Sequence, residues 1–109
     1  MTIKVETAAY FDNNFKHLKR KYPRLNEEFE ALVRQLKAGE QPGSKIPNAG
    51  YDVYKVRLKN PSAQKGKSGG FRVIYYVRMA EHIILLTIYS KSQQEDIDLE
   101  TLRRLIADY

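Results

Sequence analysis

Hydrophobic residues recur along the chain at two different periods. Between positions 11 and 36 they fall every three or four residues, which is the spacing of one face of a helix. The residues with this spacing are Phe11, Phe15, Leu18 and Tyr22, followed by Leu25, Phe29, Leu32, Val33 and Leu36. Pro23 separates the two runs and Gly39 follows the second. The pattern therefore predicts two helices joined by a short connection.

Elsewhere apolar and polar residues alternate, which is typical of strands with one buried face. The alternation covers residues 3–7, 54–59 and 71–78, whereas residues 82–90 begin apolar on both faces, as in a central strand. Residues 39–50 are rich in Gly, Pro and Asn and predict an irregular connection. Asp98 is a good N-cap for a last helix. The apolar side of that helix is formed by Leu99, Leu102, Leu105 and Ile106.

The predicted order of elements is β-α-α-β-β-β-α. This order indicates an α+β fold, with a small, mostly antiparallel sheet and helices packed on one face. A length of 109 residues fits a single domain, 1–109. The apolar face of the strands is expected to meet the helices, so the alternate positions form an open face. Those alternate positions are basic: Lys55, Arg57, Lys59, Arg72 and Arg78.

The net charge of the chain is concentrated in one segment. The chain has a net charge of +6, and residues 51–78 alone hold seven basic and one acidic side chain, which leaves the same +6. Like charges on neighbouring strands repel, so we expect an anionic partner at the open face. Cations neutralise phosphates and tyrosines stack on unpaired bases, which favours a nucleic acid. A basic face that is only solvated remains the alternative.

Several function classes are disfavoured. The chain has no cysteine, so disulfides and thiolate metal sites are excluded, and a cytoplasmic location is expected. No apolar run approaches the roughly 18 residues of a membrane span, and the first ten residues do not resemble a signal peptide. The Gly66–Ser68 sequence GKS lacks the earlier glycine of a nucleotide-binding loop, because position 61 is Pro61. With two separated histidines, neither a metal nor a cofactor is expected.

The basic cluster could also support chemistry. Cleavage of RNA without a metal needs a base for the 2′-hydroxyl, positive charge on the phosphorane and an acid for the 5′-oxygen. Crowded cations depress one another's pKa, so Lys55 beside Arg57 and Arg72 is a candidate base. The acidic residues at 95–100 are better explained by the electrostatics of a helix start.

Three segments resemble the RelE/ParE superfamily of toxins from bacterial type II toxin–antitoxin systems. They are YKVRL at Tyr54–Leu58, GFRVIY at Gly70–Tyr75 and TIYSKS at Thr87–Ser92. The resemblance implies a metal-independent endoribonuclease that depends on the ribosome, cuts mRNA in the A site and leaves a 2′,3′-cyclic phosphate. It also implies two partners, a cognate antitoxin and the mRNA on the 70S ribosome.

The resemblance assigns roles to individual residues. Lys55 and Arg57 match the base and charge stabiliser, Arg72 matches the contact to the scissile phosphate, and Lys91 is the nearest match to the acid. Residues expected to bind RNA are Lys59, Lys65, Lys67, Arg78 and Tyr89. The sequence departs from RelE, which has lysine at the Arg57 position and arginine near Lys91 and Ser92. The base-stacking tyrosine has no clear counterpart, and Tyr89 and Tyr109 are the candidates.

Two alternatives stay open. ParE-like members of the superfamily inhibit DNA gyrase and are not enzymes, although they share the fold. A degenerate toxin fold would only bind antitoxin or nucleic acid. Basic residues at positions 55, 57, 72 and 91 favour RNA cleavage over gyrase inhibition.

Overall fold

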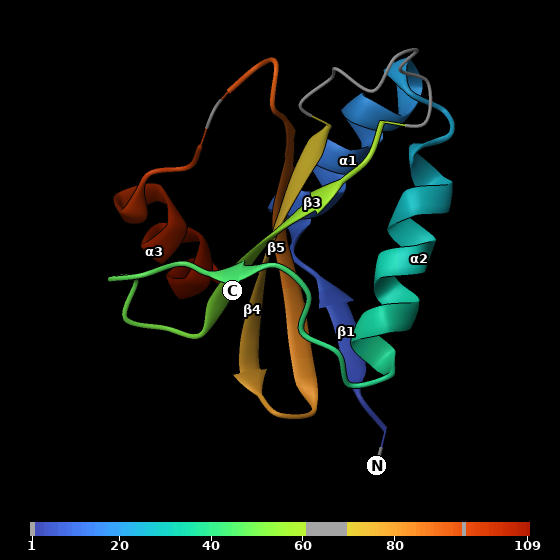
Figure 1. Cartoon of the computed structure of the whole chain (residues 1–109). Coiled ribbons are helices and arrows are strands. Elements are labelled where there is room, and N and C mark those ends of the chain that lie inside the picture. Colours follow the sequence, from blue (N-terminus) through green and yellow to red (C-terminus); the bar gives the residue numbers. More distant parts are fainter. Residues whose placement is uncertain (1, 61–69, 95) are drawn as a thin grey trace.

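The computed structural model describes residues 2–60, 70–94 and 96–109 (Figure 1). Its elements are β1 (Lys4–Thr7), α1 (Ala9–Lys21), α2 (Leu25–Lys37), β2 (Ser44–Lys45), β3 (Val53–Leu58), β4 (Phe71–Met79), β5 (His82–Ser90) and α3 (Leu99–Asp108). The α+β class and the predicted order are confirmed. The connection at 39–50 differs from the prediction in one respect, because it contains the two-residue strand β2.

The five strands form one sheet in the order β1-β5-β4-β3-β2. β2, β3, β4 and β5 pair antiparallel, whereas β1 pairs parallel with β5. β1 is short and pairs only with His82–Leu85, the first half of β5. Among the described residues, the second half of β5 therefore has a strand neighbour on one side only.

The two predicted helices α1 and α2 cover one face of the sheet. Their apolar stripes pack on the strand positions that the alternation assigned to this face, including Val56, Leu58 and Val73. The rings of Phe11, Phe15 and Phe29 contact one another with centroids 4.9 to 5.8 Å apart. This layer is the larger of the two hydrophobic cores.

α3 packs on the opposite face of the sheet, so the prediction that the helices share one face was wrong (Figure 1). Leu102 and Ile106 of α3 pack with Ile74 of β4 and with Ile84 and Leu86 of β5. These strand positions are apolar, and leaving them exposed would forfeit roughly 25 cal/mol for each Å². α3 therefore covers part of the face that was predicted to be open and basic.

Both ends of α3 are fixed by hydrogen bonds. Asp98 accepts a 2.9 Å hydrogen bond from the Thr101 amide, which confirms the predicted N-cap. At the other end the Tyr109 hydroxyl donates to Glu6 of β1 over 2.9 Å, and Glu6 also contacts His82. No helix among the described residues has the length and apolarity that a membrane crossing requires.

Candidate nucleic-acid interface

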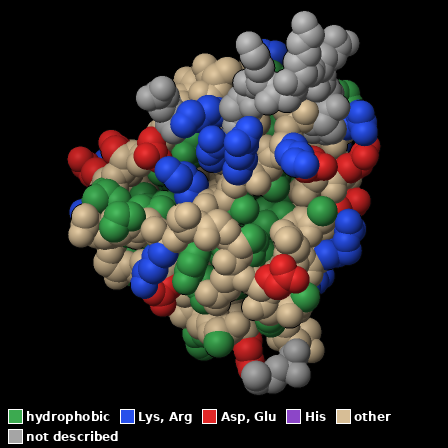
Figure 2. Space-filling model, in the orientation of Figure 1, with side chains coloured by type: hydrophobic (Ala, Val, Ile, Leu, Met, Phe, Trp, Pro, Cys, Tyr) green, Lys and Arg blue, Asp and Glu red, His purple; other side chains and the backbone are tan. Residues whose placement is uncertain are grey.

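One row of polar side chains crosses three neighbouring strands at one end of the sheet. Arg57 of β3 lies directly opposite Arg72 of β4, and Arg72 lies opposite Tyr89 of β5. Strands are about 4.8 Å apart, so this row spans about 10 Å. Lys55 precedes Arg57 by two residues and shares its face of β3. We call Lys55, Arg57, Arg72 and Tyr89 the basic row; Figure 2 shows Lys and Arg side chains gathered near the top of the view.

Gly70 brings the ends of the three strands together. Its φ is +68°, and a Cβ at this position would lie 2.3 Å from the carbonyl oxygen of Leu58, the last residue of β3. Its own carbonyl accepts a 3.0 Å hydrogen bond from the Lys91 amide, just after β5. Lys91 is therefore held at the same edge as the basic row. Lys59 also lies there, exposed, one residue beyond β3.

An acidic residue lies within this basic site. One carboxylate oxygen of Asp96 is 3.4 Å from the Lys55 ammonium and 3.4 Å from the Tyr89 hydroxyl. Burial acts to raise the pKa of Asp96, but the Ile97 amide and the Lys55 charge outweigh it, and the pKa lies below its ordinary value. Asp96 is therefore ionised at neutral pH.

Tyr89 keeps its proton over the physiological pH range. Burial, and after it the charge of Asp96, raise the pKa of Tyr89 to about 12, although the charge of Arg72 acts in the opposite direction. The phenol is thus a hydrogen-bond donor on the strand next to Arg72. Its ring is buried and packs in the core under α3.

Sequence reasoning missed Asp96. The prediction that the acids at 95–100 serve the helix start is right for Asp98 and wrong for Asp96. The face predicted to be basic therefore also carries an acid. No period or motif connects Asp96 with Lys55, which is 41 positions away. Only the packing of α3 under the sheet brings the segment that contains Asp96 to this place.

The structure also separates one predicted site residue from the others. Arg78 lies near the other end of β4, six residues from Arg72, which is about 20 Å along a strand. It lies close enough to Tyr109 for its charge to act on that phenol. Lys65 and Lys67 lie outside the described residues. The basic row, Lys59 and Lys91 thus lie together as the candidate site, and Arg78 lies apart from them.

The site suits an anion better than a metal ion. Within residues 2–60, 70–94 and 96–109, no group of three His, Cys, Asp or Glu side chains could hold a metal. Two guanidinium groups in one row can donate several parallel hydrogen bonds to a phosphate. Charge stabilisation of this kind also acts on a phosphorane, so the row can support both binding and cleavage of a phosphodiester.

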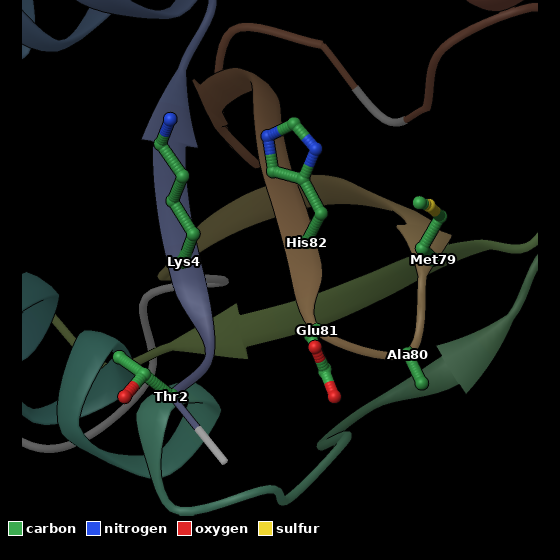
Figure 3. Close-up of a pocket in the computed structure, with 6 residues that line it drawn as sticks. All are labelled: Thr2, Lys4, Met79, Ala80, Glu81 and His82. Carbon is green, nitrogen blue, oxygen red and sulfur yellow. The ribbon is translucent and has the colours of Figure 1, made fainter.

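A cavity lies at the opposite end of the sheet, around the turn between β4 and β5. It has a volume of about 500 Å³ and is lined by Thr2, Lys4, Met79, Ala80, Glu81 and His82. Figure 3 shows Lys4 and His82 on neighbouring strands, with Met79 and Glu81 at the turn. The length of β4 separates this cavity from the basic row, so it is not part of the same site.

Comparison with known proteins agrees with this architecture. The model of the family described as the RelE toxin of the RelE/RelB toxin–antitoxin system matches residues 10–107. The fold is similar to a solved structure of the Escherichia coli toxin RelE, a double mutant in the free state, with a TM-score of 0.60. The two sequences are 15% identical, and the match covers 95% of this chain and 98% of that chain. At this identity the structural likeness is one of fold.

Proposed function

This chain belongs to the RelE family of toxins from toxin–antitoxin systems, and on that premise we propose that it is an endoribonuclease that cleaves mRNA without a metal. The observation that carries the proposal is the opposition of Arg57 and Arg72 across β3 and β4, with Lys55 on the same face. Two guanidinium groups can then bind one phosphate, with the Lys55 side chain beside it. Such a site stabilises the charge that develops on phosphorus during cleavage.

The proposed reaction is an internal transesterification of RNA. Lys55, in its neutral amine form, takes the proton of the 2′-hydroxyl, and the freed oxygen forms a new bond to phosphorus. Arg57 and Arg72 stabilise the phosphorane. The bond from phosphorus to the 5′-oxygen then breaks, and Lys91 protonates that oxygen, which leaves a 2′,3′-cyclic phosphate and a 5′-hydroxyl. Because Lys55 lies on β3 and Lys91 follows β5, base and acid approach from the two sides of Arg72.

The exposure of the site supports dependence on the ribosome. Arg57 is exposed, and Lys55 and Arg72 are partly exposed. Such a surface binds phosphates but does little to hold the 2′-oxygen in line with the leaving group, which is where much of the rate enhancement arises. We therefore propose that mRNA on the 70S ribosome is the substrate. Cleavage of one purified mRNA with and without ribosomes tests this step.

The charge of the site also indicates the chemistry of its antitoxin. A chain with a net charge of +6 is complemented by an acidic or amphipathic partner, with nanomolar affinity and fast association. We propose that the antitoxin covers or distorts the basic row. An antitoxin complex that still binds RNA and ribosomes with full affinity would contradict this part of the proposal.

The decisive experiment is induction of the protein in cells without its antitoxin, with simultaneous mapping of mRNA 5′ ends and gyrase-linked DNA breaks. New mRNA cuts should appear with the native chain and fall at least 100-fold in Lys55→Ala and Arg72→Ala. Arg104→Ala is the matched control, because it removes an exposed arginine of α3 that pairs with Glu100 over 3.4 Å. DNA breaks with intact mRNA would instead indicate a gyrase inhibitor.

A further inference from the structure

A small polar cavity lies beside the basic row, between α1 and the end of β5. Its volume is about 190 Å³, and its lining includes Asn14, His17 and Lys21 of α1, Tyr89 of β5, and Gln93 and Gln94. We propose that this cavity binds one nucleobase of the RNA strand, adjacent to the phosphate on the basic row. The inference rests on the proposed function, because it adds a base-reading site to the same RNA surface.

The cavity exists because β1 leaves the second half of β5 without a strand on that side. α1 lies along the uncovered edge, and its residues 14, 17 and 21 face the edge because they are three and four positions apart. The side-chain amide of Asn14 donates a 2.9 Å hydrogen bond to the Thr87 hydroxyl, which fastens the helix to the strand. The amide nitrogen of Gln94 donates to the Asp96 carbonyl over 2.8 Å. Two sides of the cavity are therefore fixed before any ligand arrives.

The lining has the chemistry of a base-reading site. Side-chain amides match the donor and acceptor edges of bases, and lysine matches the acceptors of guanine. Asn14 uses its NH₂ group on Thr87, which leaves its carbonyl oxygen as an acceptor. Among the described residues, the side chains of Gln93 and His17 make no hydrogen bond or ion pair with one another or with any other residue. Both remain available to a ligand.

Size and charge also favour a base over a whole nucleotide. Cavities that enclose drug-sized ligands have volumes of roughly 300 to 1,000 Å³, so about 190 Å³ fits a single ring system. Lys21 is the one charged residue of the lining, next to three amides, which is too little positive charge for a phosphate. The phosphate has its own site on the basic row.

Tyr89 connects the two sites. It ends the basic row opposite Arg72 and also lines the cavity. The distance between neighbouring strands is about 4.8 Å, so a strand whose phosphate lies on Arg72 carries its neighbouring base to the edge of β5. Bases that are splayed out of a single strand are commonly read in this way.

The test uses the four nucleoside 5′-monophosphates and inorganic phosphate as probes of the isotope-labelled protein. We expect nucleotides, and not phosphate, to shift the side-chain amide NMR signals of Asn14 and Gln93, with affinities that differ at least threefold among the four bases. Gln93→Ala should weaken binding of the preferred nucleotide five- to tenfold. It should leave the melting temperature of the protein unchanged, because Gln93 is exposed. Gln41→Ala is the matched control, with an exposed glutamine outside the cavity.

Shifts confined to the basic row, or equal affinities for all five probes, would overturn the inference. The distribution of bases around the mRNA cut sites distinguishes a failure of the base-binding cavity from a failure of the proposed nuclease function. If Gln93→Ala still cleaves but changes the base distribution at the cuts, both stand. If cleavage continues with an unchanged distribution, the base site falls and the nuclease stands. If the native chain cleaves nothing while nucleotides still shift Gln93, the nuclease falls and the base site stands.

Discussion

The carboxylate of Asp96 lies 3.4 Å from the ammonium of Lys55, in the middle of the most basic part of the chain. The same carboxylate oxygen accepts a hydrogen bond from Tyr89, and the ion pair leaves about a third of the Lys55 side chain exposed, 34%. A carboxylate that is ionised at neutral pH thus occupies part of the space in which an RNA phosphate would meet Lys55. On the proposed function, a bound RNA phosphate would have to compete with Asp96 for this lysine.

We expect Asp96→Asn to strengthen RNA binding. One negative charge about 4 Å from a bound phosphate costs about 1 kcal/mol in water, which corresponds to about fivefold in affinity. The measurement is binding of a single-stranded RNA whose 2′-deoxy substitution at the cleavage site blocks the reaction. The gain should shrink as salt is added, and the free energy of unfolding should fall by less than about 1 kcal/mol.

Asp98→Asn is the matched control for this charge. It removes an acid two positions away, and asparagine retains the N-cap of α3. We expect its RNA affinity to stay within about twofold of the native value. An Asp96→Asn variant that binds RNA no better than Asp98→Asn would show that the carboxylate does not compete with the phosphate.

Alanine substitutions at Gly70 and Gly50 distinguish two costs of replacing a glycine, which are backbone strain and a steric clash of the added Cβ. Both have positive φ, +68° and +85°, but a Cβ at Gly70 would meet the Leu58 carbonyl at 2.3 Å, whereas a Cβ at Gly50 meets nothing within 4 Å. Gly50→Ala should cost about 1 to 2 kcal/mol of unfolding free energy from backbone strain alone. Gly70→Ala should cost about 3 kcal/mol or more and also reduce RNA cleavage, because it shifts Arg72. Urea unfolding measures the loss of unfolding free energy in both variants. Equal costs for the two variants would contradict the close approach.

Acid should weaken the attachment of α3 to β1. The hydrogen bonds of Glu6 with His82 and Tyr109 lower its pKa below the ordinary value of about 4.3. A carboxylate with a depressed folded pKa contributes stability that is present above its ordinary pKa and is lost as the pH falls through the folded pKa. We therefore expect Glu6→Gln to lose less stability than the native chain between about pH 5 and pH 3.

The measurement is urea unfolding at a series of pH values. Glu81→Gln provides the control, because it removes an acid from the nearby turn between β4 and β5. The pKa values of Asp96 and Asp98 are also lowered, and both residues remain in the Glu6→Gln variant. The free energy of unfolding of this variant should therefore still fall as the pH falls. Parallel curves for the native chain and Glu6→Gln would show that the Glu6 contacts contribute nothing.

The alternation of residues predicts the two faces of β3 and β4 correctly, because a period of two has one solution once the apolar side is known. It does not predict which face α3 covers. Residues 82–90 are apolar on both sides, and Ile74 interrupts the basic positions of β4. Both features indicate a sheet that is buried on two faces. The prediction of an open face followed from the basic residues of the segment 51–78 and did not account for these apolar positions.

The site could be predicted only where the contacts follow from strand register. Lys55, Arg57 and Arg72 meet because adjacent strands of a meander pair along their length. The same register separates Arg78 from them, since it lies at the far end of β4. Asp96 could not be found, because its position depends on how the chain passes from β5 to α3 on the other face. The cavity beside Tyr89 likewise depends on the shortness of β1.

Arg72 and Arg78 are two arginines at opposite ends of one strand and therefore test where the chemistry takes place. We expect Arg72→Ala to lower the rate of RNA cleavage about 10² to 10³-fold, which is the effect of removing one donor that stabilises transition-state charge. Arg78→Ala should stay within about threefold, because about 20 Å of strand separates it from the row. Both variants should melt close to the native temperature, which circular dichroism checks.

The salt dependence of RNA binding then separates chemistry from binding in the same two variants. If Arg78 contacts a phosphate outside the cleavage site, its loss should reduce the slope of log K against log salt by about 0.7. The cleavage rate with saturating RNA should not change, because the contact is the same in the ground state and the transition state. Equal losses of cleavage in both variants would contradict the basic row as the centre of the reaction. They would indicate that the whole length of β4 binds one extended ligand.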